Sequence, residues 1–68
     1  MPRIKVKEIA EPKGWTAAKL ARRADLSYPT VADLWKDPER DVSLRTLEKL
    51  ARVLEVEIAD LIESEQRP

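Results

Sequence analysis

Apolar residues recur at helical spacing in five segments of this chain. Their separation of three or four positions is what one buried face of a helix requires. The clearest segment follows Ser43, where the apolar stripe comprises Leu44, Leu47, Leu50, Ala51 and Leu54. The other segments are Val6 to Ala10, AAKLARRA after Thr16, YPTVADLWK after Ser27, and a short group comprising Val56, Ile58, Leu61 and Ile62. The pattern predicts an all-α domain of five short helices.

The residues between these segments are of the kinds that begin and end helices. Pro12 and Gly14 close the first segment, because proline lacks an amide N–H and glycine suits a C-terminal cap. Thr16, Ser27 and Ser43 each stand where a hydroxyl can cap the following helix. The stretch DPERDV, residues 37–42, has the composition of a polar loop.

Pro29 falls in the first turn of the third predicted helix. The N–H groups of a first turn have no partner inside the helix, so the loss of one there costs little. Ser27 must then cap through the N–H of Thr30. Val31 and Leu34 point toward the core in this helix, and the outward positions are Tyr28, Pro29, Ala32, Asp33 and Lys36. The helix therefore presents its N-terminal end outward.

Residues 1–68 fit a single small domain, near the lower size limit for a self-supporting core. We expect a folded part of about residues 5–62, with loose ends at 1–4 and 63–68. Residues 3–7 alternate polar and apolar, which allows a short extended start. The expected buried residues are Leu20, Leu26, Val31, Leu34, Leu47, Leu50 and Leu54, with Val6, Ile9, Trp15 and Leu61 closing the ends.

Composition argues against enzymatic and metal chemistry. The chain has no cysteine and no histidine, which removes disulfides, most zinc sites and any nucleophile activated by histidine. We therefore predict a non-enzyme with no metal, no cofactor and no small-molecule ligand. Apolar runs are too short for a membrane span, and the start MPRIKVKE lacks the apolar core of a signal peptide. A cytoplasmic protein is expected.

Charge is unevenly distributed along a chain of net charge zero. Residues 1–54 hold 12 basic and 8 acidic residues, whereas residues 55–68 hold 1 basic and 5 acidic residues. A moderately basic body is compatible with a surface that meets polyanions. It is also compatible with an ordinary surface of mixed charge, because domains that bind nucleic acids are usually more basic.

Residues 16–36, TAAKLARRADLSYPTVADLWK, resemble the helix-turn-helix of the Cro and phage-repressor family, also called the XRE family. The matching residues are Leu20-Ala21, the turn Asp25-Leu26-Ser27, then Thr30-Val31 and Leu34. The resemblance extends to GWT before the motif and to VSLRTLEKLARVLEV and IADLI after it, so it covers about residues 5–62. It implies a lambda-repressor-like fold with the second and third helices as the helix-turn-helix.

Three departures from the family pattern stand out. Asp25 occupies the turn position that is usually glycine, and aspartate tolerates the left-handed conformation better than most residues. Ala17 stands where the family often has glutamine. Many members pair an arginine in the first helix with a glutamate late in the third, and the aligned residues here are Ala10 and Trp35. We expect Trp35 to pack against the first helix near Ala10 with its indole partly covered.

The resemblance implies a sequence-specific transcriptional regulator that binds double-stranded DNA, with its third helix, about residues 28–36, in the major groove. Carried over by position, the base-facing candidates are Ala17, Tyr28, Pro29, Ala32 and Asp33. The phosphate-facing candidates are Thr16, Lys19, Lys36, Arg40 and Arg45. A weak homodimer on a palindromic site would suit this mode of binding.

A second interpretation is a protein-interaction module on the same fold, antitoxin-like or a scaffold, with weak or no DNA binding. The zero net charge, Ala17 and a reading face poor in hydrogen-bonding side chains favour it. For Lys19 and Arg45 a solvated surface position is an equal alternative to a phosphate contact. For Asp33 the alternative to base reading is a pair with Lys36, and Glu48 with Arg52 has the spacing of an ordinary helical ion pair.

Overall fold

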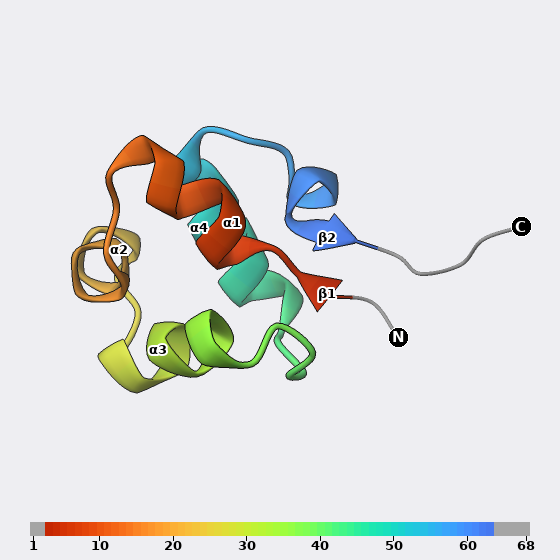
Figure 1. Cartoon of the computed structure of the whole chain (residues 1–68), viewed down its shortest axis with the longest axis horizontal. Coiled ribbons are helices and arrows are strands. Elements are labelled where there is room, and N and C mark those ends of the chain that lie inside the picture. Colours follow the sequence, from red (N-terminus) through yellow and green to blue (C-terminus); the bar gives the residue numbers. More distant parts are fainter. Residues whose placement is uncertain (1–2, 64–68) are drawn as a thin grey trace, which may run out of the picture.

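Four α-helices form from the predicted segments in the computed structural model, which describes residues 3–63 (Figure 1). They are α1 (Val6–Ala10), α2 (Ala17–Ala24), α3 (Tyr28–Lys36) and α4 (Leu44–Leu54). Two 3₁₀ turns, η1 (Glu11–Lys13) and η2 (Ile58–Leu61), and two short strands, β1 (Arg3–Ile4) and β2 (Ile62–Glu63), complete these residues. The all-α class is confirmed, with four helices in place of the five expected.

Hydroxyl side chains begin the three longer helices, as predicted. The Lys19 N–H donates to the Thr16 hydroxyl at 3.2 Å at the start of α2. The Thr30 N–H donates to the Ser27 hydroxyl at 3.4 Å at the start of α3, and Pro29 occupies the first turn there. The Ser43 hydroxyl receives the corresponding bond at the start of α4, at 3.1 Å. Each cap satisfies one amide that the helix itself leaves unpaired.

Three segments end in the same left-handed turn. Gly14, Asp25 and Glu55 have φ values of 90°, 60° and 61°. In each case the next N–H donates to the carbonyl five residues earlier, which is the Schellman pattern. The residues that carry these N–H groups are apolar and pack against the core: Trp15, Leu26 and Val56. The turn predicted at Asp25 is confirmed. Glu55 adopts the same left-handed conformation although it is not glycine.

The expected fifth helix is instead a 3₁₀ turn followed by a strand. Asp60 accepts the Glu57 N–H at 3.0 Å and so stabilises the start of η2. After Leu61, which is fully buried, the chain becomes extended because Ile62 pairs with Ile4. Apolar spacing correctly predicted an ordered element here. It was wrong about the kind of element, because Ile62 belongs to a strand and not to a helix.

Strand pairing joins the two ends of the described chain. β1 and β2 are antiparallel, with Arg3 opposite Glu63 and Ile4 opposite Ile62. The Ile4 N–H also donates to the Pro38 carbonyl at 2.7 Å, and Ile4 is only 8% exposed. The expectation of loose ends therefore fails at Arg3, Ile4 and Glu63, while residues 1–2 and 64–68 lie outside the described residues. The short extended start that the alternation allowed is present.

The core lies between the four helices and is closed by β1 and η2. Of the residues expected there, eight are buried: Val6, Leu20, Val31, Leu34, Leu47, Leu50, Leu54 and Leu61. Ile9, Trp15 and Leu26 pack against this core but remain partly exposed. Small residues of the same stripes are buried too, since Ala10 is 0% exposed and Ala21 is 3% exposed.

Leu44 does not join the apolar stripe of α4. Its side chain is 62% exposed, whereas Leu47 is 5% exposed and Leu50 is fully buried. The neighbours of α4 are α1, α2 and η2, and the burial along the helix shows that they cover it only from Leu47 onward. Periodicity alone could not reveal that the first turn extends beyond the core.

Candidate nucleic-acid interface

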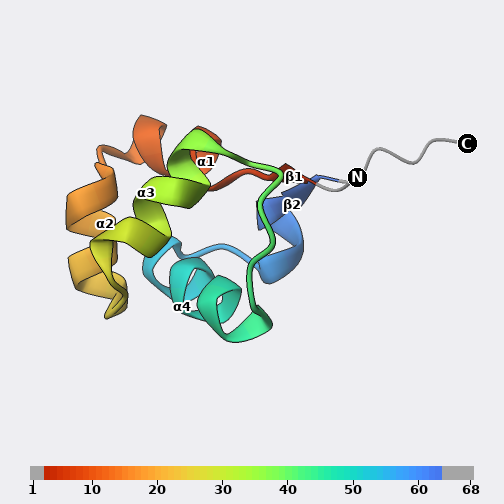
Figure 2. The ribbon, with the colours of Figure 1, turned by 90° about the horizontal axis from the view of Figure 1, so that it is seen from below.

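Helices α2 and α3 pack closely against each other on one side of the molecule (Figure 2). Asp25 turns the chain between them, and Ala21 is small enough for the two helices to approach closely. Val31 and Leu34 hold α3 to the core, with exposed fractions of 0% and 1%. The opposite face of α3 lies along the lower edge of the molecule in Figure 1 and is open to solvent.

The outward face of α3 carries the residues that the sequence placed there. Tyr28 is 56% exposed and Pro29 is exposed, while Ala32 and Asp33 are partly exposed. These four residues therefore form one accessible strip along the first two turns of α3. Ala17 is on a different helix, as the first residue of α2, and is partly buried against the core.

Asp33 forms an ion pair with Arg40 rather than with Lys36. The Arg40 Nη1 lies 3.5 Å from the Asp33 Oδ2, and the two side chains are 51% and 46% exposed. Exposed pairs of this kind contribute little to stability, typically about 0–1 kcal/mol. The pair instead brings together a residue expected to face bases and one expected to face phosphates.

The N-termini of α2, α3 and α4 all lack acidic residues. Each is capped by a neutral hydroxyl, and none has aspartate or glutamate in its first turn. The first turns of α1, η1 and η2, in contrast, contain Glu8, Glu11 and Asp60. A helix N-terminus carries a partial positive charge, so the three uncompensated ends favour an anionic ligand.

The cations expected to face phosphates are exposed at helix ends and in the loop after α3. Lys19 lies in the first turn of α2, and Lys36 ends α3. Arg45 is the second residue of α4, where a positive side chain is unfavourable for the helix dipole. A contact with an anion would offset that cost at Arg45. Thr16 is exposed beside Lys19, and its hydroxyl remains free to donate because the cap uses it only as an acceptor.

Arg22 of α2 is an exposed neighbour of the reading face. A shallow hollow between α2 and α3 is lined by Ala18, Ala21, Arg22, Leu26 and Tyr28. The exposed side chain of Arg22 therefore lines the same hollow as Tyr28. The sequence contains no signal for this proximity, because it depends on how α2 and α3 cross.

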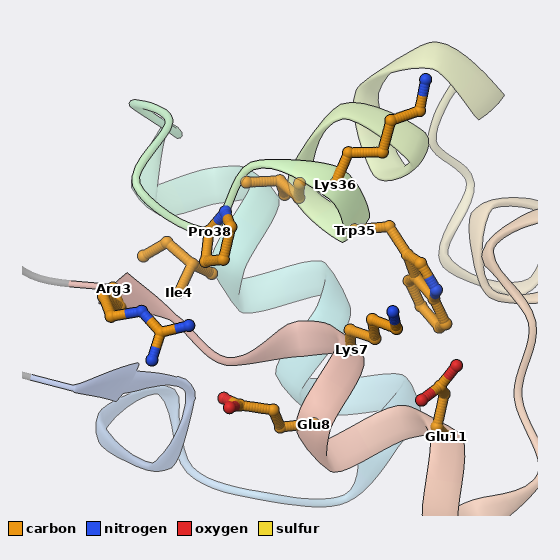
Figure 3. Close-up of a pocket in the computed structure, with 9 residues that line it drawn as sticks. Arg3, Ile4, Lys7, Glu8, Glu11, Trp35, Lys36 and Pro38 are labelled. Atoms are coloured by element: carbon orange, nitrogen blue, oxygen red, sulfur yellow. The ribbon is translucent and has the colours of Figure 1, made fainter.

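Trp35 packs against α1, as predicted. Its indole is partly covered and contacts the core, and with Lys7 of α1 and Glu11 of η1 it lines a surface hollow of about 350 Å³ (Figure 3). Ala10 of α1 is fully buried. Apolar packing thus joins α1 and α3 where many family members have an ion pair. Side chains of both charges line this hollow. Lys36 of α3 lines it together with Arg3 and Ile4 of β1.

Trp35→Ala should lower the free energy of unfolding by about 1–2 kcal/mol, because a half-covered indole loses part of a full aromatic burial. Trp35→Phe should retain most of that stability. Urea unfolding followed by circular dichroism gives both values. Tyr28→Ala is the matched control on the same helix, since Tyr28 is 56% exposed. Equal losses for Trp35→Ala and Tyr28→Ala would contradict the packing role of Trp35.

Neither a metal-binding cluster nor a membrane-spanning helix occurs among residues 3–63. No group of three or more aspartate or glutamate side chains gathers there as metal ligands would. None of the helices in this part of the chain is long and apolar enough to cross a bilayer.

Solved structures of two regulators, SinR and C.AhdI, are similar to this chain. SinR, the master regulator for biofilm formation, in complex with DNA, is 25% identical; the match covers 82% of this chain and 89% of that chain, with a TM-score of 0.76. The restriction-modification controller protein C.AhdI from Aeromonas hydrophila is 30% identical over 84% and 85%, with a TM-score of 0.75. The N-terminal DNA-binding domain of SinR from Bacillus subtilis is 22% identical over 91% and 90%, with a TM-score of 0.78, and supports the fold alone.

A search of curated protein sequences found no significant match. The family model of the Cro/C1-type helix-turn-helix DNA-binding domain, in contrast, matches residues 5–67. This range includes α2, the turn at Asp25 and α3, whose geometry is described above. The chain therefore belongs to the Cro/C1-type helix-turn-helix DNA-binding domain family.

Proposed function

We propose that this chain is a sequence-specific transcriptional regulator that binds double-stranded DNA with α3 in the major groove. The observation that carries the proposal is the exposed strip on α3 together with three helix N-termini free of acidic residues. A recognition helix needs an accessible face that is held rigidly from behind, and Val31 and Leu34 provide that anchoring. The phosphate backbone is the anion that matches the helix ends.

Base recognition would use few hydrogen bonds. Tyr28 can donate, accept or lie against a thymine methyl group, and Asp33 can accept from a cytosine amino group. Pro29, Ala32 and Ala17 offer only apolar contacts. Such a face would distinguish DNA sequences by contacts with thymine methyl groups and by DNA shape as well as by hydrogen bonds.

Phosphate contacts would position α3 in the groove. We assign this role to Thr16, Lys19, Lys36, Arg40 and Arg45. The ion pair with Asp33 would hold Arg40 at the edge of the reading face. A weak homodimer on a palindrome would place two copies of α3 about one helical turn of DNA apart, roughly 34–36 Å.

The competing function is a protein-interaction module without DNA binding. The zero net charge and the lack of amide or basic side chains on the α3 strip favour it. Selection of bound sequences from a random pool of DNA duplexes separates the two functions. Enrichment of a motif supports the regulator, and a palindromic motif supports the dimer. Recovery of no sequence above background favours the protein-interaction module.

The salt dependence of DNA binding should report the phosphate contacts. With Lys19, Lys36, Arg40 and Arg45 engaged, we expect log K to fall against log salt concentration with a slope of about −3 to −4 per chain. Lys19→Ala should reduce the magnitude of this slope by about 1. Fluorescence anisotropy at several salt concentrations measures both slopes. The control is Lys13→Ala, an exposed cation on η1, which should leave the slope unchanged.

A further inference from the structure

A second basic surface surrounds Trp15. Two adjoining hollows of about 220 and 240 Å³ share Trp15 and Arg23. We call their combined lining the Trp15 surface; it comprises Trp15, Lys19, Arg22, Arg23, Arg52, Val53 and Glu55. These residues come from the segment before α2, from α2 itself and from the end of α4, so the surface exists only in the folded chain.

The Trp15 surface is strongly basic on a chain whose net charge is zero. It holds four cations and a single carboxylate, Glu55. Within residues 3–63, none of these four cations forms an ion pair, and the pair expected between Glu48 and Arg52 is not formed. Glu55 lines the same hollow as Arg23 and Arg52, so the four cations outnumber the one carboxylate of this surface.

Helix dipoles explain only part of this arrangement. Arg22 and Arg23 lie in the last turn of α2 and Arg52 in the last turn of α4, where cations are favourable. That effect acts on each helix separately. It gives no reason for the two helix ends to meet around a partly exposed indole with Val53 beside it. An aromatic and aliphatic centre within a rim of cations is the composition of a binding surface.

The surface extends away from the reading helix. Arg22 lines one hollow with Tyr28 of α3 and the next with Trp15. The two hollows that Arg23 and Arg52 line contain no residue of α3. In Figure 1 the end of α4 lies at the top of the molecule, away from α3 at the bottom, and the segment between η1 and α2 runs down from the top to α2. A DNA duplex on α3 would therefore leave this end of the surface accessible.

We propose that the Trp15 surface binds an acidic segment of a partner protein that carries an apolar side chain. Carboxylates of the segment would pair with Arg23 and Arg52, and its apolar side chain would lie against Trp15 and Val53. Charge complementarity selects an anionic partner. The apolar centre favours a peptide over a second DNA duplex, because a phosphate backbone offers no apolar group to cover the indole. Because Lys19 belongs both to the Trp15 surface and to the phosphate contacts, the peptide would lie at the Arg23–Arg52 end of the surface while DNA lies on α3.

The test is selection from a displayed library of random 12-residue peptides against the full chain. Counter-selection uses the double variant Arg23→Ala/Arg52→Ala, whose substituted side chains are exposed, so the fold is retained; circular dichroism checks this. The proposal expects peptides rich in aspartate and glutamate with at least one leucine, isoleucine or phenylalanine. Recovery of no peptide specific for the unsubstituted chain, or of peptides without acidic residues, would overturn it.

Affinities of one recovered peptide then separate a specific site from general charge attraction. In a Trp35→Phe background Trp15 is the sole tryptophan, and its emission should change as the peptide binds. Arg23→Ala/Arg52→Ala should weaken binding by roughly tenfold or more. Lys7→Ala/Lys13→Ala removes the same charge outside the Trp15 surface and should change affinity by less than about twofold. Equal weakening by both double variants would refute the site.

DNA serves as the second probe. The Arg23→Ala/Arg52→Ala variant should bind a random-sequence 20-base-pair duplex as the unsubstituted chain does, and the duplex should not displace the peptide. A weaker affinity of this variant for the duplex, with a shallower salt slope, would identify the surface as a phosphate contact and overturn the proposal. This outcome is independent of whether α3 reads a specific sequence.

Discussion

Leu50→Ala should lower the free energy of unfolding by about 2–5 kcal/mol, a large part of the stability of a domain of this size. Leu50 is fully buried in the middle of α4, and this helix packs against α1, α2 and η2. Loss of the isobutyl group removes its transfer free energy and leaves a cavity among rigidly held neighbours.

Leu44→Ala provides a matched control for this substitution. It makes the same chemical change on the same helix, but the Leu44 side chain is 62% exposed. We expect a change within about 0.5 kcal/mol, as is usual for surface positions. Urea unfolding at one temperature measures both variants. Similar losses for the two would show that α4 does not present its Leu50 face to the core.

Asp33→Ala should weaken binding to the preferred DNA site by about 1–3 kcal/mol and relax the choice of base at one position. The Asp33 carboxylate lies on the exposed strip of α3, and its pairing with Arg40 restrains its orientation. A restrained acceptor can discriminate a cytosine amino group from the other bases in the major groove. Fluorescence anisotropy with the selected site and its single-base variants measures both effects.

Arg40→Ala tests the phosphate contact assigned to Arg40 separately from the base contact assigned to Asp33. If Arg40 contacts a phosphate, its loss should weaken binding to every sequence and lower the salt slope by about 1; it should also relax the base preference, because Asp33 loses its restraint. Asp33→Ala should, in contrast, act mainly on the preferred site. Tighter binding of Asp33→Ala to every sequence would mean that the carboxylate only repels phosphates. If the unsubstituted chain, Asp33→Ala and Arg40→Ala all fail to bind DNA, the protein-interaction function is favoured.

Local sequence signals predicted the helices well because their causes are local. Thr16, Ser27 and Ser43 cap helices through amides three residues away, and Asp25 tolerates the left-handed turn by itself. The outward strip on α3 followed from the positions of Val31 and Leu34. The contact of Trp35 with α1 came from the family pattern, in which the aligned positions are paired.

The sequence by itself therefore determined the helical class, the helix-turn-helix segment and the face that α3 presents. Only the tertiary structure decided the pairing of Arg3–Ile4 with Ile62–Glu63, the exposure of Leu44 and the partner of Asp33. It also decided that Trp15 meets Arg23 and Arg52. Caps and apolar periodicity depend on neighbours within one or two helical turns, whereas these contacts depend on how separate elements cross, and residue spacing along one element carries no record of that.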